Sequence, residues 1–363
     1  MIRMSKHSFA RWFLLSVFTG LSLIVFANID GVHGGGKKKK PKGKDEKKKP
    51  VVPEKKALPK DKTPPMMTLK GHKDWIFSVQ FSSDGKSLIT ASRDKTIKVW
   101  DLASKKATAT LEKNPTDVKT AIFSPDGKLA VSTTGAWNKK AKKWEGEIRF
   151  WDIKNSKVSK TVKGHGDVIE AIAFSPDGNK LITAGKDQTA IIWDVKTGKA
   201  LQTLKGHKGI IHDVAFNKDG SKVATASADK TVKIWNVADG KEVGLIKDHK
   251  RDVTSVAFTD DGKIITGSLD ETVKVSGADG KEIRSLKAPE GIWAVAVSPD
   301  GKYLAASGWN DTVKVWSLAD GKELFYRNGH ERTVTGVVFS PDSSKLVSVG
   351  IDSVIQVWEV PKK

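Results

Sequence analysis

Beyond residue 65, short runs of alternating hydrophobic and polar residues recur along the chain, and a turn signal separates each pair of runs. The turn signals are tetrapeptides such as SSDG at 82 and SPDG at 124, 175 and 298. Alternation over four to eight residues on either side of an Asp- and Gly-containing turn predicts a β-hairpin. Residues 66–361 are therefore predicted to be all-β and built from short antiparallel strands.

Two further markers repeat in step with these turns. One is a Gly-His pair, as in LKGH at 69–72 and VKGH at 162–165, and the other is a tryptophan at the end of a strand. The tryptophan slots are Trp100, Trp151, Trp193, Trp235, Ser276, Trp316 and Trp358. They are 40 to 42 residues apart, except that 51 residues separate the first two. This period predicts seven repeats of a unit with four short strands.

The repeats resemble those of the WD-repeat β-propeller family. The resemblance rests on Gly71-His72, Trp100-Asp101, Trp151-Asp152, Gly164-His165 and Trp193-Asp194. It implies a seven-bladed β-propeller of four-stranded antiparallel blades, because a single four-stranded sheet buries its faces only by stacking against its neighbours. The last repeat lacks an outer strand, and a spare strand at 66–70 precedes the first repeat. We expect this N-terminal strand to pair with the last blade and close the ring.

In that family, one blade's His, Ser or Thr, Asp and Trp form a buried tetrad of hydrogen bonds. The resemblance assigns complete structural tetrads to the first and fourth blades: His72, Ser92, Asp94 and Trp100, and His207, Ser227, Asp229 and Trp235. The other slots are altered: Gly185 and Gly350 replace the hydroxyl in blades three and seven, Ser276 replaces the tryptophan in blade five, and Pro289 and Asn310 replace His and Asp in blade six. We interpret these histidines as structural, since their spacing follows the repeat. Blades five and six are predicted to be the softer, less stable side of the ring.

The first strand of each repeat contains a slip in its hydrophobic spacing. Ile76, Val79 and Phe81 are separated by three and then two positions, which predicts a β-bulge that turns one residue toward the top face of the ring. The predicted bulge residues are Phe77, Lys119, Glu170, His212, Thr254, Trp293 and Thr335.

The resemblance also places the residue before each tetrad Asp on the top face, which implies an apolar arc across blades five, six, seven and one. Its members are the predicted partner-binding residues Trp75, Phe77, Leu269, Trp293, Trp309 and Ile351. Exposed aromatic residues at a rim are typical of binding hot spots. The alternative is that the rings only plug the channel or pack on neighbouring blades.

The net charge of +21 is concentrated in the first 65 residues, which hold 16 basic and 5 acidic residues. Basic residues precede an apolar run at 12–27, which is typical of a signal peptide and shorter than the roughly 20 residues of a membrane span. We predict a signal peptide or N-terminal anchor at 1–27 and a disordered Lys-, Pro- and Gly-rich linker at 28–65. The protein is expected to be exported, periplasmic or extracellular, or alternatively anchored in a membrane through residues 12–27. The lysine run in the linker argues against export.

The linker is expected either to be a solvated spacer or to contact anionic polymer or membrane surfaces non-specifically. It contains no aromatic residue on which bases would stack, so specific nucleic-acid binding is not expected.

The sequence contains no cysteine, which excludes disulfides, thiolate metal sites and cysteine nucleophiles. Glu170 and His212 are the acid–base pair considered at the channel mouth, and no nucleophile or cofactor motif accompanies them. We therefore expect no catalytic residue, no metal and no cofactor. The predicted function is a monomeric, non-catalytic protein-interaction scaffold whose top face binds a partner protein or peptide. The alternative is a propeller enzyme or small-ligand binder that uses the channel mouth.

The second repeat carries an insertion near Trp137 to Glu147, which reads WNKKAKKWEGE. One interpretation is a basic loop that reaches over the top face or contacts an anionic partner. The other is a longer hairpin whose tryptophans fold back on the blade.

Overall fold

The computed structural model describes residues 63–361, and every regular element in this range is a β-strand. The first three blades contain β2 (Ile76–Phe81), β3 (Ser87–Ser92), β4 (Ile97–Asp101), β5 (Lys106–Leu111), β6 (Thr120–Phe123), β7 (Leu129–Asn138), β8 (Lys143–Asp152), β9 (Lys157–His165), β10 (Ile169–Phe174), β11 (Lys180–Gly185), β12 (Thr189–Asp194) and β13 (Ala200–Lys205). The remaining blades contain β14 (Ile211–Phe216), β15 (Lys222–Ser227), β16 (Val232–Asn236), β17 (Glu242–Ile246), β18 (Val253–Phe258), β19 (Ile264–Ser268), β20 (Thr272–Ser276), β21 (Glu282–Lys287), β22 (Ile292–Val297), β23 (Tyr303–Gly308), β24 (Thr312–Ser317), β25 (Glu323–Asn328), β26 (Val334–Phe339), β27 (Lys345–Gly350), β28 (Val354–Glu359) and β1 (Met67–Lys70).

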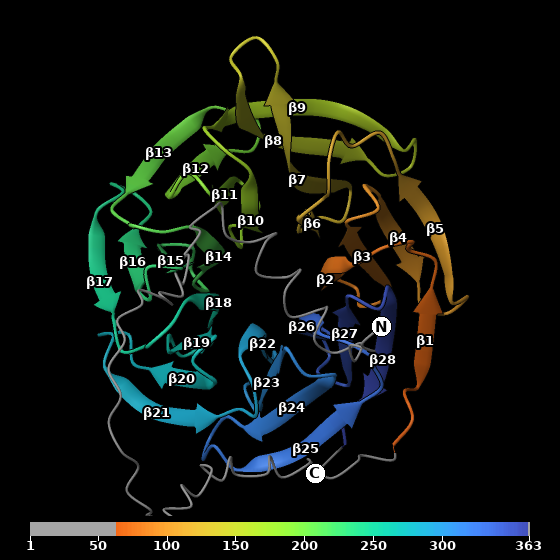
Figure 1. Ribbon diagram of the computed structural model, residues 1–363, viewed down its shortest axis with the longest axis vertical. Coiled ribbons are helices and arrows are strands. Elements are labelled where there is room, and N and C mark those ends of the chain that lie inside the picture. The colour runs from red at the N-terminus through yellow and green to blue at the C-terminus, as the bar shows by residue number, and fades with distance from the viewer. Residues whose placement is uncertain (1–62, 362–363) are drawn as a thin grey trace, which may run out of the picture. The chain divides into compact units, whose positions relative to one another are not determined.

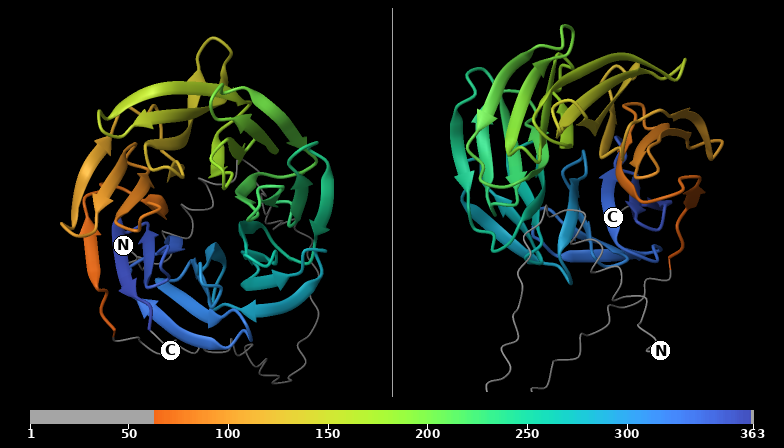
Figure 2. Two further views of the ribbon diagram at one scale, coloured as in Figure 1. Left: turned by 180° about the vertical axis from the view of Figure 1, so that it is seen from behind. Right: turned by 45° about the horizontal axis from the view of Figure 1, so that its top comes forward.

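The strands form seven four-stranded antiparallel sheets that are arranged as blades around a ring (Figures 1 and 2). Six blades consist of four consecutive strands, and the seventh has the order β1-β28-β27-β26. In this last blade Leu69 of β1 lies opposite Ile355 of β28, in antiparallel register. The predicted fold class and the predicted closure by the N-terminal strand are confirmed.

Hydrophobic side chains hold each blade to the next. The described residues contain seven buried clusters, each shared by two neighbouring blades. In one of them Ile182 and Leu204 of blade three pack with Val214 and Trp235 of blade four. The clusters follow one another around the ring, so no blade depends on its own two faces alone.

Six of the seven predicted bulges are present in the innermost strands. The register shifts between Ile76 and Ser78, which leaves Phe77 as the extra residue of β2. The same shift isolates Glu170, His212, Thr254, Trp293 and Thr335 in the corresponding strands. In blade two the paired strand begins at Thr120, and the N–H of Lys119 donates to the carbonyl of Thr133 at 3.2 Å.

The insertion in blade two forms a longer hairpin. β7 and β8 are ten residues long and stay paired from Leu129 and Asp152 out to Asn138 and Lys143. Trp137 and Trp144 are 50% and 40% exposed, so they do not fold back on the blade.

Most of the predicted N-terminal segments lie outside the described residues, including the whole signal or anchor segment at 1–27 and the linker up to residue 62. Within residues 63–361 there is no helix that is both long and apolar enough to cross a bilayer.

Candidate functional site on the top face

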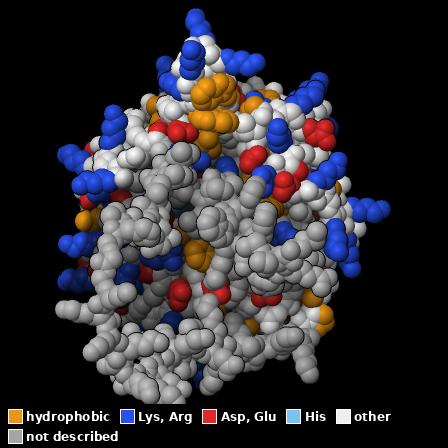
Figure 3. Space-filling model, in the orientation of Figure 1, with side chains coloured by type: hydrophobic (Ala, Val, Ile, Leu, Met, Phe, Trp, Pro, Cys, Tyr) orange, Lys and Arg blue, Asp and Glu red, His pale blue; other side chains and the backbone are white. Residues whose placement is uncertain are grey.

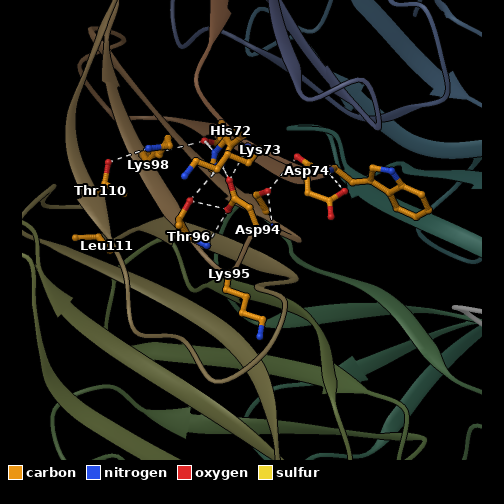
Figure 4. A network of polar contacts seen from close by, with 12 residues as sticks. His72, Lys73, Asp74, Asp94, Lys95, Thr96, Lys98, Thr110 and Leu111 are labelled. Carbon is orange, nitrogen blue, oxygen red and sulfur yellow. Dashed lines mark hydrogen bonds and ion pairs between the residues drawn. The ribbon is translucent and has the colours of Figure 1, made fainter.

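The top face carries the loops that connect one blade to the next and the turns between the second and third strand of each blade. In blade one a chain of hydrogen bonds fastens these two segments together (Figure 4). Nδ1 of His72 lies 2.9 Å from Oδ2 of Asp94, and its Nε2 lies 2.8 Å from Oγ1 of Thr90. The indole N–H of Trp100 donates to the same Thr90 oxygen at 2.9 Å.

The predicted hydroxyl members of the tetrads, Ser92 and Ser227, are wrong. The hydroxyls that join His to Trp belong to Thr90 and Thr225 instead. Ser92 lies two residues further along the strand, about 7 Å away. There its hydroxyl accepts the N–H of Asp94 at 3.0 Å and donates to the carbonyl of Asp74 at 3.2 Å.

This correction also completes two tetrads that the sequence predicted to be incomplete. In blade three, Thr183 lies 2.7 Å from Nε2 of His165 and accepts the indole N–H of Trp193 at 2.8 Å. In blade seven, Ser348 joins His330 to Trp358 in the same way. Blades one, three, four and seven therefore contain complete tetrads.

The other blades retain parts of the network. Blade five keeps the pairs of His249 with Asp270 and with Thr266, but Ser276 stands in the tryptophan slot. The Ser276 hydroxyl is buried without a hydrogen-bond partner among the described residues. Blade two keeps only the bond from Trp151 to Ser132, at 2.9 Å.

The tetrad carboxylates are stabilised in their ionised form. Burial alone raises the pKa of Asp94, but hydrogen bonds from His72 and the Lys73 amide lower it by more, so this pKa lies well below its ordinary value. The other oxygen of Asp94 accepts the N–H of Thr96, which closes a turn with Lys95 at φ 67°. Asp94 of the tetrad therefore fixes both the loop before the first strand and the turn in which Lys95 has a left-handed conformation.

Five of the six predicted partner-binding residues lie half-buried on the top face, namely Trp75, Phe77, Leu269, Trp293 and Trp309. The sixth prediction, Ile351, is wrong as a surface residue because its side chain is only 4% exposed. Its amide donates to the carbonyl of Thr333 at 3.0 Å, as the amide of Trp309 does to that of Gly291, so the two turns share this backbone bond and differ in the burial of the side chain.

The arc is divided into two aromatic clusters, each with a cation over a ring. In the first cluster Trp75 and Phe77 are in edge contact, with ring centroids 6.5 Å apart. The Arg93 guanidinium lies 4.6 Å from the Trp75 ring, and the Lys119 ammonium lies 4.3 Å from the Phe77 ring. These distances are within the range of cation–π contacts.

The second cluster belongs to blades five and six. Trp293 and Trp309 are also in edge contact, at 6.4 Å, and the Arg251 guanidinium lies 5.6 Å from the Trp309 ring. The backbone N–H of Trp309 donates to the carbonyl of Gly291, and a Cβ on Gly291 would lie 3.3 Å from Leu269. Leu269 thus borders the tryptophan pair.

Two of the bulge residues form hydrogen bonds to the next blade. Thr335 of blade seven donates to the carbonyl of Ile76 in blade one, and Thr254 of blade five donates to that of Ile292 in blade six. These threonines fasten one blade to the next. Blade seven, with Thr335 and the buried Ile351, therefore separates the two aromatic clusters.

The candidate acid–base pair is not assembled. Glu170 lies 3.8 Å from the ammonium of Lys186, whereas His212 lies 3.8 Å from the carboxylate of Asp252. Each side chain thus has a different ion partner. Residues 63–361 contain no group of three or more His, Asp or Glu side chains placed to hold a metal ion.

A cavity of about 540 Å³ at the opposite end of the channel was not predicted. Its lining includes Phe81, Phe123, Phe174, Phe216 and Phe258. Each of these residues ends the innermost strand of its blade, directly before the turn signal. That repeated phenylalanine is the sequence signal that would have indicated the cavity.

Comparison with known proteins supports the same architecture. The family model described as "WD domain, G-beta repeat" matches residues 63–101 and 156–194, and the model described as "IFT122 first beta-propeller" matches residues 191–363. The chain is 27% identical over 289 residues to Nuclear distribution protein PAC1 of Arthroderma otae, covering 78% of this chain and 59% of that protein. It is 28% identical over 335 residues to WD repeat-containing protein 1 of Xenopus tropicalis, covering 80% of this chain and 54% of that protein.

A further similarity is to Autophagy-related protein 16 of Arabidopsis thaliana, with 30% identity over 121 residues, 33% of this chain and 22% of that protein. The chain thus spans between about a fifth and three fifths of the length of these relatives.

Proposed function

Because the chain belongs to the WD-repeat β-propeller family, whose members serve in general as protein-interaction scaffolds, we propose that its top face binds a partner protein or peptide without catalysis. The binding surface consists of the two aromatic clusters, Trp75 with Phe77 and Trp293 with Trp309. One observation carries the proposal: both clusters combine half-buried aromatic rings with a cation held over a ring.

Tryptophan and arginine are the residue types most enriched in binding hot spots. The rings offer apolar area, and Lys119 and Arg251 add positive charge beside it, whereas Arg93 lies 3.8 Å from the carboxylate of Asp74. A complementary partner segment carries apolar side chains for the rings and acidic side chains for the cations. The absence of catalysis is part of the proposal, and it is supported by the separate ion partners of Glu170 and His212.

The test replaces Trp293 and Trp309 with Ala in the full chain. Proteins that co-purify with the wild-type chain are identified, and their binding to the variants is then measured directly. We expect binding to fall by about thirtyfold or more, because a hot-spot residue contributes roughly 2 kcal/mol or more. The variant Trp75→Ala with Phe77→Ala tests the first cluster in the same way.

The control is Glu170→Gln with His212→Asn, which changes the polar part of the same face. This variant is expected to retain the partner. Unchanged binding by the double tryptophan variant would contradict the proposal. A loss of roughly 3 to 5 kcal/mol of stability per tryptophan would instead assign the rings to the core. Any turnover that is lost with Glu170 and His212 would contradict the absence of catalysis.

A further inference from the structure

The hairpin of β7 and β8 extends beyond the rest of its blade. Beyond Gly135 and Gly146 it continues with Trp137 opposite Trp144 and ends with Asn138 opposite Lys143. The connection between the two strands projects past the ring (Figure 1), and the space-filling view shows basic and hydrophobic side chains together on this projection (Figure 3).

The root of the hairpin is fixed by close packing. A Cβ on Gly135 would lie 2.7 Å from Cγ2 of Val168, and one on Gly146 would lie 2.6 Å from the carbonyl oxygen of Asp167. Only glycine permits this approach to the loop that leads into blade three. β9 pairs with β8 up to His165 opposite Gly146, so the outer part of the hairpin is held by its own two strands.

The turn at the tip is held by one side chain. Oδ1 of Asn138 accepts the N–H groups of Lys140 and Ala141 at 3.0 and 2.9 Å, and Nδ2 donates to Glu145 at 2.8 Å. The hairpin therefore presents its tip in a defined conformation.

The tip combines two chemical properties. Trp137 and Trp144 are in edge contact, with centroids 5.8 Å apart, and both are exposed. The tip also carries four exposed lysines, Lys139, Lys140, Lys142 and Lys143. Among the described residues no acidic side chain forms an ion pair with any of these four lysines. The tip thus presents apolar area and uncompensated positive charge together.

We propose that this hairpin binds the surface of an anionic lipid bilayer. Indole rings favour the interface between headgroups and acyl chains, and lysines are attracted to anionic headgroups. A projecting tip can enter the headgroup layer of a bilayer. A peptide is usually held in a groove or along a strand edge, and only residues 143–145 of β8 lie beyond its pairing with β9. All four cations are lysines, which act as point charges and suit a diffuse anionic surface better than bidentate recognition of a particular carboxylate.

The absence of cysteine makes a site-specific test possible. Ala141→Cys places a single thiol at the exposed tip of the full chain, where an environment-sensitive fluorophore is attached. The matched control is Ala103→Cys, which carries the same fluorophore at an exposed position in the turn between β4 and β5. Both proteins are mixed with vesicles of phosphatidylcholine alone and with vesicles of phosphatidylcholine and phosphatidylglycerol in equal parts.

We expect the emission of the fluorophore at the tip to shift to the blue with the anionic vesicles only, and that of the control fluorophore to stay unchanged. Replacing Trp137 and Trp144 with Ala in the Ala141→Cys background should abolish the shift. Each Lys→Gln change at the tip should weaken the response about fivefold in vesicle concentration. Melting curves identify any variant that fails to fold. If the double tryptophan variant does not fold, the lysine variants test the proposal instead, because changing an exposed lysine should not disturb the fold.

The proposal is overturned if the fluorophore at the tip does not respond to anionic vesicles, or if the tryptophan and lysine variants respond like the parent Ala141→Cys protein. An equal response of the control fluorophore in the turn between β4 and β5 also overturns it. A response to polyglutamate without a response to vesicles would assign the hairpin to an acidic polypeptide and reject the lipid surface.

Discussion

Blades four and six reach the same fold with opposite chemistry at the top face. In blade four His207 is held by Asp229 and Thr225, and Trp235 completes the hydrogen-bonded chain. In blade six the corresponding positions are Ala288, one residue before the predicted Pro289, with Asn310 and Ala306, while Trp316 is retained. Blade six packs Trp293 against Trp309, and it shares with blade four only the backbone bond between turn and loop, from Trp309 to Gly291 in blade six and from Ala228 to Ile210 in blade four.

This difference shows which interaction forms a blade and which only fixes its loops. Both blades contribute to buried hydrophobic clusters that they share with their neighbours. Blade six is complete without any tetrad, so the hydrophobic interface is what forms the blade. The tetrad fixes the top loops of blade four, and in blade six the Trp293–Trp309 pair lies at the same end of the blade.

Blade six contains more buried polar groups without a hydrogen-bond partner than blade four. The hydroxyl of Ser307 and the indole N–H of Trp309 are buried without a hydrogen-bond partner among the described residues. An unsatisfied buried polar group costs roughly 1 to 3 kcal/mol. This cost is consistent with the expectation from the sequence that blades five and six form the softer side.

The largest effect is expected from removing β1, which contributes to a hydrophobic interface and to no tetrad. Met67 and Leu69 of β1 are buried with Trp100 and Ile355. Deleting residues 1–70 should therefore lower the free energy of unfolding by roughly 4 kcal/mol or more, since removal of one buried large side chain costs roughly 2 to 5 kcal/mol. Denaturant unfolding measures this loss.

Deletion of residues 1–62 is the matched control, because it leaves β1 in place. Equal stability of the two truncated proteins would contradict both the closure by β1 and the primacy of hydrophobic interfaces.

The next largest effect is a pH dependence in blade four that blade six lacks. Burial raises the pKa of Asp213 to about 6, although its carboxylate accepts hydrogen bonds from the Val256 amide and the Ser255 hydroxyl of blade five. Ala294 occupies the corresponding position in blade six. Because the folded protein binds this proton more tightly than the unfolded chain, the free energy of unfolding should rise as the pH falls from about 7 to about 4. The expected contribution is roughly 3 kcal/mol.

Asp213→Asn removes the titration, so the wild type and the variant should differ in the pH slope of their stability between about pH 4 and 7. The tetrad carboxylates affect stability over a different pH range. Because their pKa values are lowered in the folded protein, protonating them decreases the free energy of unfolding only as the pH falls below about 4. Parallel slopes for the two proteins between pH 4 and 7 would show that Asp213 is not protonated preferentially in the folded state.

The parts of the structure that follow from backbone periodicity were predictable. Seven repeats, the closing strand and the bulges depend on spacing along the chain, as in Ile76, Val79 and Phe81. The structure contains the repeats, the closing strand and six of the seven predicted bulges. The tetrad hydroxyl depends on a distance between side chains. Thr90 and Ser92 lie on the same face of one strand, so the alternation of side chains does not show which of them belongs to the tetrad. The position of the Trp100 indole N–H, which lies within hydrogen-bond distance of Thr90, determines that it is Thr90.

The candidate site was less predictable for a similar reason. Trp293 and Trp309 were placed on the top face from their repeat positions, but the cation over Trp309 is Arg251, which comes from the preceding blade's loop. Ile351 has the same repeat position and the same backbone bond as Trp309, yet its side chain is buried. Contacts between loops of different blades are not encoded in the spacing of a single repeat.

The smallest expected effect isolates the polar network itself. His207→Ala should lower the free energy of unfolding by roughly 1 to 3 kcal/mol, because it leaves Asp229 and Thr225 without their histidine partner. Pro289→Ala is the control in the corresponding loop of blade six, where Ala288 stands in place of the histidine, and its effect should be within about 1 kcal/mol. Combining His207→Ala with Thr225→Val should cost less than the sum of the two single changes, since both break the same chain. If His207→Ala leaves the denaturant midpoint unchanged, or if the two changes are strictly additive, the tetrad does not act as a unit, and blades four and six differ in composition only.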